Sequence, residues 1–135
     1  MSVLGIAIAM SSSMSSQSLD DLKWKNRILI ISAPYTPDSL ASKQVKLLNG
    51  DLNGLADRKL VVLMVDLDTI TLPIKSISHD TRVDSIPEKY VNHNDFQIIL
   101  IGLDGTMKET YKRPVTTKVL FEKIDAMPMR KDEKN

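Results

Sequence analysis

The sequence predicts an α/β domain whose four-stranded mixed sheet has helices on both faces. The first observation is a set of short apolar runs, rich in β-branched residues, at 28–32, 60–65 and 98–102. Because their apolarity is continuous rather than alternating, we expect strands that are buried on both faces. The second observation is helical periodicity at 37–48 and 116–127, which supplies helices to cover such a sheet.

The first predicted helix follows the first apolar run. Pro37 fits the first helical turn, where its missing N–H costs nothing, and the negative charge of Asp38 suits that end of a helix. Apolar residues then recur at spacings of three and four as far as Leu48. Asn49-Gly50 ends the helix before a second short piece. A right-handed crossover through this helix makes the first two strands parallel.

The stretch between the second and third apolar runs is predicted to be less regular. Isoleucine and leucine alternate with threonine at 69–72, and Pro73 follows. This pattern predicts an exposed hairpin or an irregular insertion rather than a central strand. Residues 83–91 predict one short helix, with Ser85 as its N-cap and Pro87 in its first turn.

The last part of the chain predicts a β-hairpin followed by a helix. Asp104-Gly105 favours a tight turn between antiparallel strands, and Met107 and Tyr111 alternate with lysines, as on an edge strand with one wet face. One of the threonines at 116–117 caps the helix, and Pro128 ends it. The predicted buried face of this helix consists of Leu120, Phe121, Ile124 and Met127.

This order of elements is that of a minimal thioredoxin-like fold, a four-stranded mixed sheet between helices. The alternative is a flavodoxin-like or other three-layer sheet, which requires more strand–helix repeats than the sequence contains.

The composition narrows the range of functions. The 135 residues suit one domain with its own core. A net charge of +1 and 4% aromatic residues give no reason to expect nucleic acid as a partner. Cysteine is absent, so thiol-dependent redox activity, disulfides and cysteine-bound metal centres are excluded.

Residues 1–18 differ from the rest of the chain and are left out of the predicted fold. An apolar block at 3–10 precedes a serine-rich stretch, and Ala7-Ile8-Ala9 is a pattern that signal peptidase accepts. The block is too short to span a bilayer, and it predicts a degenerate signal or a disordered leader. The thioredoxin-like domain is placed at 19–130, with a charged tail at 131–135.

Three segments carry a resemblance to a known family: LDDLKWKNRILIISAP at 19–34, FQIILIGLDGTMK at 96–108 and LFEKIDAMPMR at 120–130. The ending IDAMPMR is the most specific of these, and the Trp-Lys-Asn-Arg stretch before the first strand is next. In this order they resemble the bacterial family "domain of unknown function 4174". That family is similar to the C-terminal domain of animal sushi-repeat-containing extracellular proteins. The resemblance implies a thioredoxin- or peroxiredoxin-like fold, often behind a signal peptide, and no established activity.

The chain departs from redox-active thioredoxins in two respects. Thioredoxins place a cis-proline before the third core strand, facing the active-site cysteines, whereas residues 93–96 here read His-Asn-Asp-Phe. Both the thiols and the proline that presents substrate to them are therefore missing.

The turn at 33–39, between the first strand and the first helix, is a candidate contact site. Ligands collect at such positions because free backbone N–H groups and the helix dipole attract anions, and Tyr35, Thr36 and Ser39 add hydroxyl groups. There is no glycine-rich cradle, and a purely structural turn, fixed by its two prolines, explains the same residues.

A second candidate patch is formed by Trp24, Lys25 and Arg27 before the first strand. It offers an aromatic ring and two positive charges to a partner. The sequence favours another interpretation, in which Trp24 is buried in the core and Arg27 pairs with Asp57 or Asp125. Two further cations are expected to be solvated charges: Lys108 and Arg130.

The remaining polar candidates match known sites poorly. Zinc donors are present, without the spacing of a metal signature, at His79, Asp80, His93 and Asp95. Asp66 and Asp68 follow the second strand, where paired carboxylates share acid and base roles in some enzymes, and polar loop residues explain them equally well. We therefore expect no metal, no cofactor and no catalytic residue.

Three functions are compatible with the sequence. The first is a non-catalytic binding or interaction module of the cell envelope, periplasmic or secreted, with a protein partner or small ligand. The second is a non-thiol enzyme or small-ligand binder that uses the turn at 33–39 with Asp66, Asp68 or His93. The third is a structural role as a dimer through an exposed sheet edge. A cytoplasmic location is the alternative to export.

Overall fold

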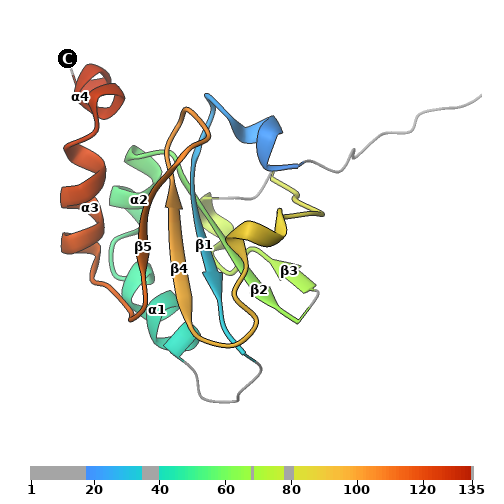
Figure 1. The fold of residues 1–135 in the computed structure, drawn as a ribbon. Coiled ribbons are helices and arrows are strands. Elements are labelled where there is room, and N and C mark those ends of the chain that lie inside the picture. The colour runs from blue at the N-terminus through green and yellow to red at the C-terminus, as the bar shows by residue number, and fades with distance from the viewer. Residues whose placement is uncertain (1–17, 35–39, 68, 78–80, 135) are drawn as a thin grey trace, which may run out of the picture.

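A computed structural model of the chain describes residues 18–34, 40–67, 69–77 and 81–134. Within them a five-stranded mixed sheet has the order β3-β2-β1-β4-β5 (Figure 1). The strands are β1 (Arg27–Ser32), β2 (Leu60–Asp66), β3 (Thr69–Thr71), β4 (Gln97–Ile101) and β5 (Met107–Tyr111). The α-helices are α1 (Leu40–Asn49), α2 (Leu52–Asp57), α3 (Thr117–Asp125) and α4 (Pro128–Lys134).

The centre of the sheet consists of the predicted buried strands. β1 pairs in parallel with β2 and antiparallel with β4, and every residue of β1 and β4 is buried. The predicted α/β class is therefore confirmed. The prediction of four strands was one strand short, because the predicted exposed hairpin adds β3 antiparallel to β2.

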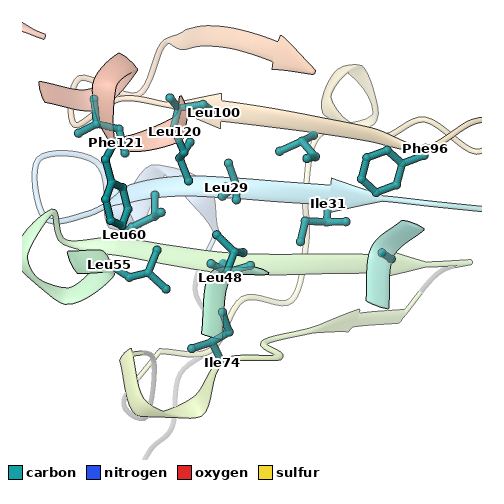
Figure 2. Packing of buried hydrophobic residues seen from close by; sticks show 14 of the residues in the cluster. Leu29, Ile31, Leu48, Leu55, Leu60, Ile74, Phe96, Leu100, Leu120 and Phe121 are labelled. Carbon is teal, nitrogen blue, oxygen red and sulfur yellow. The ribbon is translucent and has the colours of Figure 1, made fainter. Parts of the chain in front are cut away.

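One face of the sheet carries the α-helices. Leu29 and Ile31 of β1 and Leu100 of β4 point to this side and pack with Leu48 of α1 and Leu120 of α3 (Figure 2). All five have no exposed surface. Close packing of this kind is what fixes the relative positions of the helices and the sheet.

α3 buries the face that the sequence predicted, and Thr116 caps it by accepting a hydrogen bond from the backbone N–H of Val119 at 3.2 Å. Pro128 does not simply end this helix. α3 ends at Asp125, and Pro128 is the first residue of α4, a position where proline is tolerated. The segment that the sequence suggested as a charged tail continues α4 as far as Lys134.

The other face of the sheet carries no α-helix in the described part of the chain, which corrects the prediction of helices on both faces. Ile30 and Leu63 point to this side and pack with Leu22, Val83 and Tyr90. Leu22 lies in a 3-10 helix, Leu19–Leu22, and Tyr90 in another, Glu88–Tyr90, whose N-cap is Pro87 rather than the predicted Ser85. Isolated apolar residues in such irregular segments bury surface without leaving a periodic pattern.

The β4–β5 hairpin has its predicted turn, with Gly105 at a φ of 79°. The predicted alternation along β5 holds at Tyr111, which packs against the core, and is wrong at Met107, which is 53% exposed. A bulge in the pairing places Ile101 opposite Met107 and Leu100 opposite Glu109. A one-residue shift moves side chains to the opposite face of a sheet, so the sequence pattern alone misplaced Met107.

Candidate functional site

The predicted ligand-binding turn lies where β1 ends. Ala33 and Pro34 follow this strand and are half-buried, and Asp66, at the end of the neighbouring β2, is exposed. Four of the residues predicted to act here lie outside the described residues: Tyr35, Thr36, Ser39 and Asp68.

Two adjoining depressions open at this end of the sheet. One of about 70 Å³ lies between Pro34 and the segment 91–93. The other, of about 170 Å³, extends toward Ile86 and Glu88. The walls that they share are Val65, Leu67, Val91 and His93. His93 thus reaches the predicted place, whereas Asp66 lines neither depression.

The polar groups around His93 do not form an acid–base site with Asp66. Nε2 of His93 lies 3.2 Å from Oε2 of Glu88, and both side chains are exposed. In the stretches that the structure describes, no three His, Asp or Glu side chains gather as metal ligands would. His79 and Asp80, the other half of the predicted zinc donors, lie outside these stretches.

Asn92 shapes the turn at which thioredoxins carry their proline. Its Oδ1 accepts hydrogen bonds from the backbone N–H groups of Asn94, at 2.9 Å, and Asp95, at 3.0 Å. A side chain, rather than a proline ring, therefore fixes the backbone here. Asn92 and His93 together line the smaller depression.

Trp24 is exposed, contrary to the prediction that it is buried. Its side chain is 61% exposed and its φ is 70°. The backbone N–H of Trp24 donates to the carbonyl of Leu103 at 2.7 Å, and Nζ of Lys23 lies 5.6 Å from the centre of the indole ring. Leu22, which is 3% exposed, occupies the core position that Trp24 was expected to fill.

Arg27 and Lys25 do not share a surface with each other. Lys25 is exposed, but Arg27 has no exposed surface. Nη1 of Arg27 donates to the carbonyl of Arg58 at 2.9 Å and to Oε1 of Glu133 at 3.1 Å. The predicted partners of Arg27 pair with other arginines instead: Asp57 pairs with Arg130, and Asp125 pairs with Arg58 and Arg130.

Arg130 was predicted to be a solvated charge and is 4% exposed. It donates to carboxylate oxygens of Asp57, Asp125 and Glu133, and Nη1 also donates to the carbonyl of Asp57 at 3.0 Å. These bonds join α4 to the ends of α2 and α3. Sequence spacing gives no signal for the contact with Asp57, since the two residues are far apart in the chain.

Arg58 completes this cluster and was missed by the sequence analysis. It holds Asp125 with two hydrogen bonds, at 3.0 and 2.9 Å. Its guanidinium carbon also lies 3.9 Å from the centre of the Phe121 ring. A bidentate pair stacked on an aromatic ring is a strong form of ion pair, and the hydrogen bonds from Arg58 lower the pKa of Asp125.

Residues 18–133 match the family described as "Domain of unknown function (DUF4174)". The chain belongs to the DUF4174 family. This assignment confirms the resemblance carried by the three sequence segments, of which two meet at the arginine cluster through Arg27 and Arg130.

Two curated animal proteins are similar to this DUF4174 chain. Coiled-coil domain-containing protein 80 of Danio rerio is 28% identical to this chain. The match covers 92% of this chain and 16% of that protein. Sushi repeat-containing protein SRPX2 of Bos taurus is 26% identical over 85% of the chain, which spans 26% of that protein. The chain thus spans about a quarter or less of the length of either relative.

Solved peroxiredoxins share the fold. The 2-Cys peroxiredoxin of Plasmodium vivax superposes with a TM-score of 0.60 at 14% identity, covering 84% of this chain and 72% of its own. Thioredoxin peroxidase I of Plasmodium yoelii gives a TM-score of 0.56 at 14% identity, covering 87% and 81% of the two chains. At this identity the likeness establishes a thioredoxin-like fold and no activity.

No helix in the described ranges is both long and apolar enough to cross a bilayer.

Proposed function

We propose that this cysteine-free DUF4174 domain is a non-catalytic binding module that contacts a protein partner through Trp24 and the lysines on either side of it. The observation that carries the proposal is the 61% exposure of the Trp24 side chain. An indole ring in water gains free energy when a partner buries it, and tryptophan is enriched among residues that dominate protein interfaces. Lys23 and Lys25, both exposed, flank the ring.

The backbone around Trp24 supports a binding role. A left-handed conformation at a bulky residue is strained, and such strain persists where the surrounding structure enforces it. The hydrogen bond from Trp24 to Leu103 anchors the turn on the β4–β5 hairpin. The stem of Lys23 lies over Gly105, where an added Cβ atom would be 3.2 Å from its Cδ. A ring presented on a fixed turn loses little entropy when it binds.

The proposed location is the cell envelope, periplasmic or secreted. The apolar block at 3–10 and the Ala7-Ile8-Ala9 pattern support export. N-terminal sequencing of the protein recovered from its native cell tests this location. A mature chain that begins after residue 9 supports it, and one that keeps its first residues contradicts it.

A second candidate function is small-ligand binding at the depressions beside His93. The observation that favours it is Leu67, which lines both depressions, is 65% exposed and has a φ of 55°. An exposed apolar side chain on a strained turn beside an imidazole is suited to holding a small, partly apolar molecule.

Affinity capture from the native envelope fraction tests the first proposal. Wild type is compared with Trp24→Ala and with a matched control, Val119→Ala, which removes another exposed apolar side chain (45%) on α3. We expect a partner that wild type and Val119→Ala retain and that Trp24→Ala loses by at least tenfold.

A Tyr35→Ala variant in the same experiment addresses the turn at 33–39. Loss of the partner with Tyr35→Ala but not with Trp24→Ala would assign the contact to the turn at 33–39 instead of Trp24. Equal recovery by all four proteins would contradict a contact through Trp24.

A further inference from the structure

A pocket of about 180 Å³ lies at the end of the sheet opposite the Pro34 turn. Its walls include Arg27 at the start of β1, Leu103 and Lys108 of the β4–β5 hairpin, and residues 127–129, where α4 begins. The strand pairing brings these segments together. Because β4 is antiparallel to β1 and Ile28 lies opposite Ile101, the start of β1 lies beside the end of β4. All three of the segments that identified the family meet here.

Arg27 lines this pocket, and its side chain carries buried hydrogen-bond donors without a partner. The side chain has no exposed surface, and only its Nη1 atom is engaged, by Arg58 and Glu133. Nε and Nη2 are buried without a hydrogen-bond partner. Leaving a buried donor of a charged group unpaired destabilises the folded state. A ligand with acceptor oxygens removes this destabilisation.

The charges around Arg27 also favour an anion. The cluster that it belongs to contains four cations, at Arg27, Arg58, Lys59 and Arg130. It contains three carboxylates, at Asp57, Asp125 and Glu133. In the opposite wall, Nζ of Lys108 lies 3.0 Å from Oδ2 of Asp104, so these two charges balance each other. The cluster thus has one more cation than carboxylate, and Arg27 is its one member that lines the pocket.

The rest of the pocket is apolar. Leu103, Met127, Pro128 and Met129 supply side chains without charge, and methionine adapts readily to the shape of a ligand. The volume is comparable to that of an engineered protein cavity of about 150 Å³ that binds benzene. A pocket of this volume has room for one ring or a short branched chain.

We propose that this pocket binds a small monocarboxylate with an apolar body about the size of benzene. The carboxylate accepts hydrogen bonds from Nε and Nη2 of Arg27, and the apolar body packs against Met127 and Met129. Trp24 does not line the pocket, although its backbone N–H is bonded to Leu103, which does.

NMR titration of the isotope-labelled full chain with sodium benzoate tests the proposal. Benzamide serves as the uncharged analogue, and sodium phosphate at equal ionic strength serves as the anion without an apolar body. We expect saturable amide shifts at 102–108 and 127–130 with benzoate, and at least tenfold weaker effects with the other two. Equal binding of benzamide or phosphate would overturn the proposal, and so would the absence of saturation by benzoate.

Arg27→Gln is the obvious variant, but it also breaks the bonds to Arg58 and Glu133 and risks unfolding. A matched pair avoids this problem. Met129→Trp fills the pocket, whereas Met107→Trp adds the same ring at an exposed position outside the pocket. Benzoate affinity should fall at least tenfold in the first and stay unchanged in the second. Benzoate binding that survives Met129→Trp would place the ligand elsewhere.

Discussion

Trp24 and Leu67 share an unusual combination of backbone and exposure. Both have a positive φ, at 70° and 55°, and both expose more than half of an apolar side chain, at opposite ends of the sheet. A folded domain gains nothing for its own stability from either feature. Strain combined with apolar exposure therefore marks the two positions at which binding best explains the residue type.

The left-handed backbone at Trp24 makes a direct prediction about stability. Trp24→Gly should be more stable than Trp24→Ala by about 1 kcal/mol, because glycine adopts a positive φ without a clash at Cβ. Urea unfolding measures the difference. At Lys43, an exposed position inside α1, the same pair of substitutions should give the opposite order. A Trp24→Ala protein at least as stable as Trp24→Gly would contradict the strained turn.

The sequence predicted the burial of apolar residues well and the burial of long polar residues poorly. The continuous runs at Ile28–Ser32 and Ile98–Gly102 identified buried strands, because burial on both faces leaves a local pattern. Arg130 was expected at the surface and Arg27 beside Asp57 or Asp125, yet Arg130 is buried and Arg27 pairs with Arg58 and Glu133, because these partners come from segments remote in sequence. Charge type alone does not show that a distant carboxylate or carbonyl is available.

At the scale of elements, α1 is tied to the linker before α3 by one side chain. Gln44 has no exposed surface. Its Nε2 donates to the carbonyl of Val115 at 2.9 Å, and its Oε1 accepts from the N–H of the same residue at 2.7 Å. The amide thus pairs with backbone as a neighbouring strand would, and it fixes where α3 begins relative to α1.

Gln44→Leu should lower the free energy of unfolding by about 2 kcal/mol, because it leaves both backbone groups of Val115 unpaired. Lys46→Leu, on the exposed side of the same helix, is the matched control and should change stability by less than about 0.5 kcal/mol. Thermal and urea unfolding measure both variants. Equal stability of Gln44→Leu and wild type would show that the pairing with Val115 contributes nothing.

The elements themselves were largely predictable, and the covering of the sheet was not. The end of α1 at Asn49 and the N-cap of α3 at Thr116 have local causes, so both could be predicted from the sequence. The face covered by Leu22, Val83 and Tyr90 is assembled from single apolar residues in 3-10 turns and extended chain. Such residues have no period, and only the folded molecule shows that they share a surface.

At the scale of the whole molecule, ion pairs hold α4 to the rest of the fold. Glu133 accepts hydrogen bonds from Arg27 of β1 and Arg130 of α4, and Arg130 also binds Asp57 and Asp125. Burial alone raises the pKa of Glu133, but these hydrogen bonds outweigh it and lower that pKa. Hydrogen bonding to Arg130 likewise lowers the pKa of Asp57. The attachment of α4 therefore depends on carboxylates that stay ionised.

The hairpin that lines the Arg27 pocket contains another such carboxylate. Burial raises the pKa of Asp104, but hydrogen bonds from Thr106 and Lys108 outweigh it and bring that pKa down to about 2. A pKa lowered by folding stabilises the folded state above the unfolded pKa of 3.8, and this contribution is lost as the pH falls toward 2.

The folded chain should therefore lose stability between about pH 4.5 and pH 2, as these carboxylates gain protons in the unfolded state before they do so in the folded one. Urea midpoints measured across this range test the expectation. Asp104→Asn should flatten the lower part of the curve, because the variant has no proton to bind there. Asp20→Asn, which removes an exposed carboxylate of the first 3-10 helix, should follow the wild-type curve. A wild-type midpoint that stays constant down to pH 2.5 would mean that the ion pairs around Arg130 and Lys108 do not contribute to folding, and that α4 is held by contacts that do not titrate, such as the hydrogen bond from Arg130 to the carbonyl of Asp57.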